Sequence, residues 1–445
     1  MRTPLVVALL ALLATSASAA GFRVLTVGKV ARFENRGDPN ENGGTISVGR
    51  DRELATLHDP RCPTTSKVEI EAYLQSTYRV RVLLSVALDC ARWQERRGGW
   101  VYEDPTGPVR AIRYASRGLR IEVKGPGFEP IGGPVGFVQG QLAIGDQLLR
   151  ARVHNFRRND GRRVVSRKPS SSGAAGEAGF WEVLSGEDDS DATEDATIRR
   201  LEKAARRDAK DGRSRFLLAM LHLYRFAQQV TDFRAPSEAA RAEIRTANGW
   251  FAKALPLLWN ESAGAGDSRV PGFAAAAKYA QGVVDGDPTL RDAGLADLER
   301  AVAVNAFFNV FDYIPVVQIA APGDPLFQQA FSKVTTYLTD PETLGCVADQ
   351  PEICFNAGFA PHNIQGSLIL FGDVYAKGGV LADAQRWYRL ASFFPDTRTW
   401  RFKAISDDRV ANAAARVALY QDGDPSNDPP VIGMGPEACA VCHTR

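Results

Sequence analysis

The last seven residues of the chain contain the side chains best suited to do chemistry. Cys439 and Cys442 are separated by two residues, and His443 follows directly. Two thiols at this spacing can add to the two vinyl groups on one edge of a porphyrin, while the adjacent imidazole ligates its iron. A C-x-x-C disulfide and half of a zinc site are the alternatives. A zinc site would need a second ligand pair of similar spacing, which the sequence lacks.

This C-x-x-C-H sequence resembles the haem-attachment motif of c-type cytochromes. The resemblance covers five residues and implies one covalent haem c, held by Cys439 and Cys442, with His443 as the proximal iron ligand. It does not extend to a cytochrome fold, because only two residues follow the motif. The sixth position of the iron can be vacant or filled by water or by a partner. If this protein supplies the distal ligand, we expect it upstream of the motif. Met434 is slightly favoured over His362, which can instead be a helix-cap or core histidine.

The N-terminus has the pattern of an export signal at residues 1–20. Arg2 precedes the apolar run Leu5–Ala14, and Ala17-Ser18-Ala19 forms a small-residue cleavage site. The run is too short to span a membrane comfortably, and no other run approaches that length. We therefore expect a soluble exported protein without a membrane span, in the periplasm or elsewhere in a bacterial envelope, where haem c is attached.

Export also bears on the six cysteines, because exported proteins keep disulfides. Short loops within one domain favour the pairs Cys62–Cys90 and Cys346–Cys354. The remaining two cysteines belong to the C-terminal motif.

Residues 21–168 predict an antiparallel β-sandwich or barrel. Apolar and polar residues alternate over residues 68–74, 80–88 and 119–123, and Gly-Pro turns separate such runs. The stretch from Asp59 to Tyr102, with Cys62, Cys90 and Trp93, resembles a β-domain of uncharacterised exported bacterial proteins, which implies no activity.

A flexible charged linker is expected at residues 169–195, because Ser, Gly and Ala are followed there by an acidic run. The linker separates two oppositely charged parts. Residues 21–168 hold 26 Lys and Arg against 16 Asp and Glu, and residues 169–445 hold 27 against 36. Solvated faces, mutual docking and attraction to an anionic envelope surface all fit this asymmetry. No specific nucleic-acid binding is expected, because no reading motif is present.

Residues 196–421 have the period of helices and predict a repeat-like all-α domain, followed by a tail at residues 422–445. The stretch from Gly366 to Asp396 resembles a tetratricopeptide repeat, with small and large residues at matching positions: Leu368, Phe371, Gly372, Tyr375, Ala384, Tyr388 and Ala391. A degenerate solenoid is favoured over a non-repeating bundle. Such an array implies a concave face for a protein partner.

Together these features predict an α+β multidomain protein without a recognisable catalytic constellation. The sequence has no G-x-S-x-G, no G-x-x-x-x-G-K and no H-E-x-x-H. We expect a mono-haem c-type protein that transfers electrons or senses redox state with a protein partner. The alternative is an envelope scaffold without haem, in which the helical repeats bind a protein and the C-terminal C-x-x-C is a disulfide.

Overall fold

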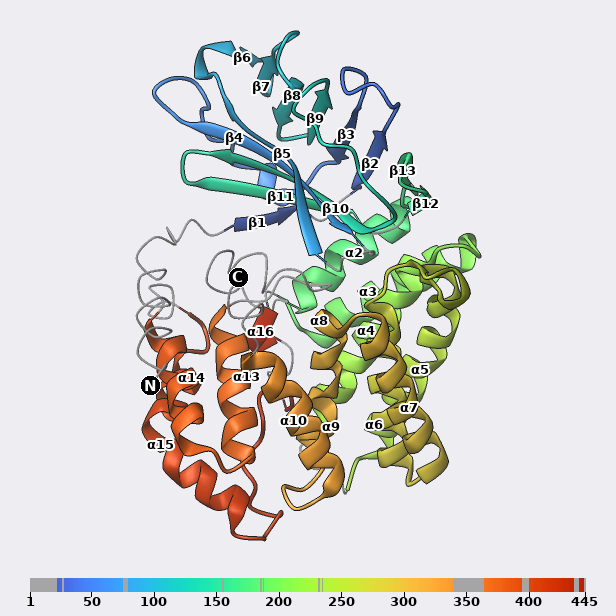
Figure 1. Ribbon diagram of the computed structural model, residues 1–445, viewed down its shortest axis with the longest axis vertical. Helices are drawn as coiled ribbons and strands as arrows, with labels where there is room; N and C mark the ends of the chain where they lie inside the picture. The colour runs from blue at the N-terminus through green and yellow to red at the C-terminus, as the bar shows by residue number, and fades with distance from the viewer. Residues whose placement is uncertain are drawn as a thin grey trace.

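A computed structural model of the chain confirms the expected α+β class (Figure 1). It describes residues 22–25, 28–74, 79–153, 156–184, 186, 188–230, 233, 235–339, 364–393, 400–435 and 440–443. The predicted signal segment, the Cys346–Cys354 pair and His362 lie outside these residues. Strands occupy the N-terminal part and helices nearly all of the rest, so we call residues 22–166 the β-half and residues 171–443 the helical half.

The β-half contains a five-stranded and an eight-stranded sheet. The first has the order β1 (Phe22–Leu25), β11 (Gln147–Val153), β10 (Val135–Ile144), β4 (Ser66–Leu74), β5 (Arg79–Leu88). The second has the order β12 (Phe156–Asn159), β13 (Arg163–Ser166), β2 (Val30–Glu34), β3 (Gly43–Val48), β9 (Gly118–Lys124), β8 (Val109–Ala115), β7 (Gly99–Glu103), β6 (Trp93–Arg96). These neighbours pair antiparallel, except that β1 runs parallel to β11.

Alternation along the strands explains how the two sheets form one core. Val68, Ile70 and Ala72 of β4 are buried, and they belong to the same apolar cluster as Ile46 of the other sheet. At Gly140 of β10 a side chain would meet Ile46, since a Cβ there would lie 2.9 Å from the Ile46 Cδ1 atom. The glycine thus allows the sheets to approach closely at their centre.

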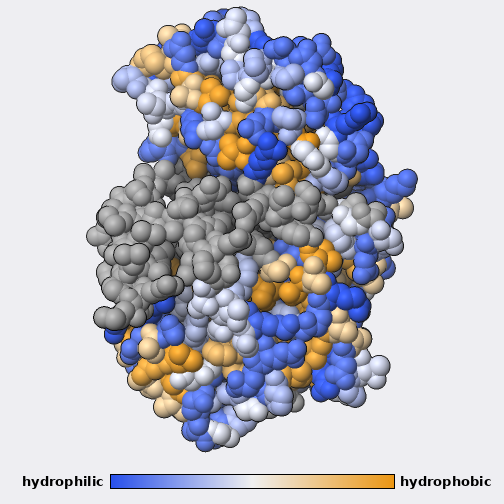
Figure 2. Space-filling view, viewed as in Figure 1, coloured by the Kyte–Doolittle hydropathy of each residue, from blue (hydrophilic) through white to orange (hydrophobic). Residues whose placement is uncertain are grey.

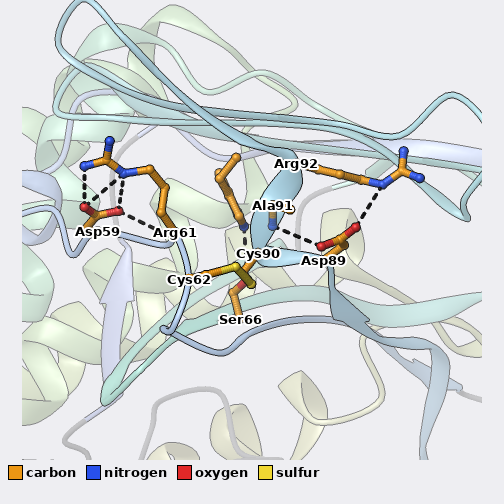
Figure 3. Close-up of a disulfide and its surroundings, with 9 residues drawn as sticks. Asp59, Arg61, Cys62, Ser66, Asp89, Cys90, Ala91 and Arg92 are labelled. Atoms are coloured by element: carbon orange, nitrogen blue, oxygen red, sulfur yellow. Dashed lines mark hydrogen bonds and ion pairs between the residues drawn. A yellow bond between two sulfur atoms is a disulfide. The ribbon is translucent and has the colours of Figure 1, made fainter.

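Cys62 and Cys90 form a disulfide at one edge of the β-half, which is the pairing predicted from the sequence (Figure 3). Their Cα atoms are 5.0 Å apart. Asp89 accepts a hydrogen bond from the backbone N–H of Ala91 at 3.0 Å, which fixes the short helix η2 (Cys90–Arg92) that presents Cys90. The disulfide therefore joins two turns that are each ordered by local polar contacts.

The predicted flexible linker is wrong for most of its length, because residues 171–184 form a helix. This helix, α2 (Ser171–Leu184), packs against α3 (Asp191–Arg207). The small residues that suggested flexibility allow close helix packing instead. A Cβ at Gly176 would lie only 2.7 Å from the Leu201 Cδ2 atom, so a larger residue would force the helices apart.

The helical half continues from α3 with helices that begin at polar caps. Ser190, Asp211, Ser237 and Asp287 each accept a backbone N–H from the first turn of the helix that follows. The helices are α4 (Gly212–Gln229), α5 (Glu238–Leu258), α6 (Val270–Asp285), α7 (Pro288–Val304), α8 (Ala306–Asn309), η4 (Val310–Tyr313), α9 (Ile314–Ile319), α10 (Pro325–Thr339), α13 (Ile364–Lys377), α14 (Leu381–Phe393), α15 (Lys403–Gln421) and α16 (Ala440–His443). A short η3 (Glu261–Ala263) lies between strands β14 (Trp259–Asn260) and β15 (Ala265–Gly266).

The two halves are in contact, with α2 at their junction (Figure 1). Arg269, which is fully buried, forms a bidentate ion pair with Asp267 at 2.6 and 2.7 Å. Its guanidinium also lies over the rings of Tyr73 and Phe137 from the β-half, 5.3 Å from each centroid. Docking of the halves is thus observed, but buried groups contribute to it as well as the exposed charges that the sequence suggested.

Many charged side chains of the β-half lie on the outer surface and not at the junction with the helical half. Figure 2 shows hydrophilic side chains over much of the visible face of the β-half. Exposed arginines of its second sheet, such as Arg32 and Arg120, pair with glutamates on their own strands at 2.7 and 3.2 Å. Much of the positive charge of this half is therefore solvated and locally paired.

Candidate functional site

The C-terminal motif lies on a short helix against the helical half. Helix α16 covers Ala440 to His443, and Cys439 lies outside the described residues. Ala440 and Val441 are buried in the apolar cluster of the later helices, and Cys442 is only 7% exposed. His443 is half-buried. The helix contacts α13 and α2, so the motif is part of the packed structure.

A polypeptide segment that we call the strap, residues 422–435, leads to this helix across the surface of the helical half. Its backbone is bound at successive points. The Tyr420 hydroxyl donates to the Pro429 carbonyl at 2.5 Å, Arg416 to the Pro430 carbonyl at 2.9 Å, and Gln318 to the Ile432 carbonyl at 3.0 Å. The strap therefore has a defined path from α15 past α9.

Asp373 of α13 is the centre of the strap's anchorage. This residue is fully buried, and its carboxylate accepts the backbone N–H of Ile432 at 2.9 Å and the Tyr388 hydroxyl at 2.6 Å. Arg409 and Arg416 of α15 lie 3.3 and 3.4 Å from the same carboxylate. One aspartate thus joins three helices to the strap.

The electrostatics of this anchor follow from its burial. Burial raises the pKa of the Tyr388 phenol, and the neighbouring Asp373 carboxylate raises it further, so the hydroxyl stays a hydrogen-bond donor. Burial lowers the pKa of Arg416, but Asp373, Tyr420 and Tyr388 act together against this and raise it overall. A carboxylate surrounded by two guanidiniums, a phenol and an amide is well compensated for its loss of water.

A second contact fixes the start of α16. The Arg401 guanidinium donates a hydrogen bond to the carbonyl of Gly186, which has φ +64° in the turn after α2. A Cβ at Gly186 would lie 3.3 Å from the Ala440 Cβ. Glycine therefore fits both the backbone angle and the close approach of the motif helix.

Met434, the favoured distal ligand candidate, lies at the end of the strap. Gly433 and Gly435 on either side have φ values of 100° and 85°, as expected for a bend that glycines permit. The Gly435 N–H donates to the Ala227 carbonyl of α4 at 3.0 Å. The half-buried Met434 side chain packs on the apolar cluster of α2–α6, whereas Val441 of the motif belongs to the cluster of the later helices.

The donor chemistry of the motif fits the attachment of haem c. Cys442 supplies a thiol and His443 an imidazole from one helix, and Cys439 precedes that helix directly. The packing adds a condition, because α16 contacts α13 and α2 and Cys442 is only 7% exposed. The Cys442 thiol would have to be accessible when haem is attached. Within the described residues no three His, Cys, Asp or Glu side chains are grouped to hold a metal ion.

Sequence reasoning missed the anchor of the motif. Asp373 follows Gly372 inside the best repeat-like stretch, where a charged residue at a helix position that packs inward could have drawn attention. Its partners come from Arg409, Arg416 and Ile432, up to 59 residues away, so no local pattern identifies them. His222 of α4 has its Nδ1 atom 2.6 Å from the Glu243 carboxylate of α5.

Comparisons with known proteins add no further assignment. No family model, no curated protein and no solved structure matches this chain. A search of the helices in the described part of the chain finds none that is long and apolar enough to cross a membrane.

Proposed function

We propose that the protein is an exported mono-haem c-type protein that works in electron transfer or redox sensing beside a protein partner. The observation that carries the proposal is the C-x-x-C-H sequence at residues 439–443. The strap that precedes it in the chain is bound to the helical half. Cys439 and Cys442 would hold the haem by thioether bonds and His443 would ligate its iron. The bound group supplies one-electron redox chemistry.

The chain's own residues would act by holding the motif in place. Asp373 and its partners fix the strap, and Arg401 orders the turn against the first residue of α16. A fixed attachment point would hold a bound haem in one position relative to the helical half. In the same proposal the β-half is a sandwich of two sheets, and the helical half is a degenerate tetratricopeptide-like array that offers a partner surface.

The test is expression of the full chain with its signal segment in a bacterium that attaches haem c. We expect a Soret band that survives acid–acetone extraction, and loss of covalent haem in Cys439→Ser and Cys442→Ser. The matched control is Thr444→Ser, which leaves the motif intact and should keep full haem content. Colourless protein from this host would overturn the proposal.

The sixth iron ligand is tested on the same protein. If Met434 binds the iron, Met434→Ala will change the near-infrared and low-temperature EPR spectra of the oxidised protein, and Met434→Leu will do the same while preserving the apolar packing. If His362 is the ligand, His362→Ala will have this effect. Unchanged spectra in all variants would exclude both residues.

A second candidate function is a scaffold whose C-terminal C-x-x-C is a disulfide. The burial of Cys442 at 7% exposure favours it, because a buried thiol in an exported protein is suited to a structural bond. Peptide mapping without reduction separates the candidates. A Cys439–Cys442 disulfide in colourless protein supports the scaffold, and a haem-linked peptide excludes it.

A further inference from the structure

A cleft at the junction of the two halves is lined by positive charge that the haem proposal does not use. Five cationic side chains line it, from the β-half, from the connection to α2, and from α4: Lys29, Arg152, Arg167, Lys168 and Arg213. Lys29, Arg152 and Arg213 are each less than 8% exposed. Buried cations that converge on one cleft from three parts of the chain form a built polar site.

Three carboxylates line the same cleft, and each is already engaged. Glu177 forms ion pairs with Lys29 and Arg213, both at 3.1 Å, and Asp208 pairs with Arg167 at 3.3 Å. The third, Asp211, caps α4. Five cations and three carboxylates thus line the cleft, and Arg152 is also attracted by Glu71 and Asp267, which lie outside the lining.

The first turns of two helices add to this positive potential. Ser170 and Gly173 at the start of α2 line the cleft, as do Asp211 and Ser214 at the start of α4. Asp211 accepts the Ser214 N–H at 2.9 Å and its hydroxyl at 2.7 Å, and the Ser170 hydroxyl accepts the Gly173 N–H at 3.0 Å. Helix N-termini carry partial positive charge and commonly face bound anions.

The titration behaviour of the buried cations agrees with crowded positive charge. Burial lowers the pKa of Lys29, and repulsion by Arg213 lowers it further, against the attraction of Glu177. Burial also lowers the pKa of Arg152, with added repulsion from Arg150 and Arg269, against the attraction of Glu71 and Asp267. An anion in the cleft would relieve both effects, because it favours the charged form of each group.

We propose that this cleft binds a phosphate group or a similar small dianion, which bridges the β-half and the helical half. The lining holds more cations than carboxylates, which suits an anion, and Lys168 is exposed at the cleft, where it can contact the anion. Because Lys29 belongs to one half and Ser214 to the other, the bound anion would hold the halves together. The proposal is independent of whether haem is attached.

The test is titration of the full-length exported protein with inorganic phosphate at constant ionic strength, followed by calorimetry and by the melting temperature. We expect saturable binding and a higher melting temperature with phosphate than with chloride. Lys168→Glu should weaken phosphate binding roughly tenfold or more, because it removes a charge-assisted contact and adds a repelling charge. A parallel titration with glycerol phosphate tells whether the site accepts the free ion alone or also a phosphate monoester.

The matched control is Lys210→Glu, in the nearby turn before α4. Lys210 is exposed and does not line the cleft, so the same change of charge should leave phosphate binding within about twofold of the unaltered protein. Equal losses in the two variants would show unspecific surface attraction and would overturn the proposal. No saturable phosphate binding by the unaltered protein would overturn it as well.

Discussion

Two buried aspartates of the helical half lie in opposite surroundings. Asp373 faces two arginines, a tyrosine hydroxyl and a backbone N–H, and it anchors the strap. Asp312 of η4 is also buried, but within the described structure its Oδ2 atom has no hydrogen-bond partner. Burial raises the pKa of Asp312 well above its ordinary value. A buried carboxylate stabilises a fold only when the fold supplies donors to it.

The neighbours of Asp312 explain why it remains without a donor. A Cβ on Gly272 would lie 1.9 Å from the Asp312 Oδ2 atom and 2.9 Å from the Asn309 Oδ1 atom, so the two oxygens face the same spot. The Asn309 amide group donates to the carbonyls of Ser268 and Ala301 at 2.9 and 2.6 Å, which fixes its oxygen toward Asp312. Two acceptors that face each other are best satisfied when the acid is protonated.

The largest expected effect is the loss of the anchor at Asp373. Asp373→Asn removes the counter-charge of the buried Arg416, while Arg409 keeps Asp408 at 2.9 Å, so we expect a loss of about 3–5 kcal/mol in the free energy of unfolding. Urea unfolding measures the loss, and faster hydrogen exchange at the Ile432 amide reports release of the strap. The control is Asp407→Asn, an exposed partner of Lys403, which should change stability by less than about 0.5 kcal/mol.

The second prediction is a gain in the free energy of unfolding. If it fails, the contrast between Asp312 and Asp373 is wrong. Asp312→Asn replaces an acid that must stay protonated by an amide that can donate to Asn309, so we expect a gain of about 1–3 kcal/mol at pH 7. An acid with a raised folded pKa contributes full stability below its unfolded pKa, near 3.8, and loses it as the pH rises. The advantage of the variant should therefore grow from pH 4 to pH 7.

Urea unfolding of both proteins at the two pH values measures this difference. The exposed Asp292 provides the control, because Asp292→Asn should show no comparable growth with pH. An Asp312→Asn protein that is less stable than the unaltered protein at pH 7 would mean that the carboxylate is charged and has a partner.

The smallest expected effect tests how much the Tyr388 hydroxyl contributes to the anchor at Asp373. Tyr388→Phe removes one of the donors to Asp373 and keeps the ring that packs against Gly372, so we expect a loss of about 0.5–1.5 kcal/mol. Because Arg409 and Arg416 remain in place, exchange at the Ile432 amide should change little. A loss as large as that of Asp373→Asn would show that the phenol, and not the charge pair, carries the anchor.

The parts of the fold that sequence reasoning predicted are those set by local patterns. Alternation of apolar and polar residues predicted β4 and β5. The spacing of Cys62 and Cys90 within one domain indicated their disulfide. The linker prediction was wrong because a segment rich in Ser, Gly and Ala, such as α2, can be a flexible chain or a tightly packed helix. Only the partner helix distinguishes the two, through contacts such as Gly176 with Leu201.

The candidate site was predicted by its chemistry and not by its surroundings. Cys439, Cys442 and His443 stand out by type and spacing alone. The groups that position them are ordinary charged and polar residues. The role of Asp373 is recognisable only in the folded structure, where its partners come from α14, α15 and the strap. The same holds for the cleft, where Lys29 and Arg213 are brought together by Glu177 across the junction.

The path of the strap has a consequence for the order of events during folding. Its last bond joins Gly435 to Ala227, residues far apart in sequence, across helices that must already be assembled. Closing so long a loop is slow relative to forming each helix hairpin, so the C-terminal segment is expected to settle last. Until then the Cys442 thiol, which is buried in the folded protein, remains open to the solvent. An enzyme that modifies the Cys442 thiol would therefore have to act before the C-terminal segment has settled.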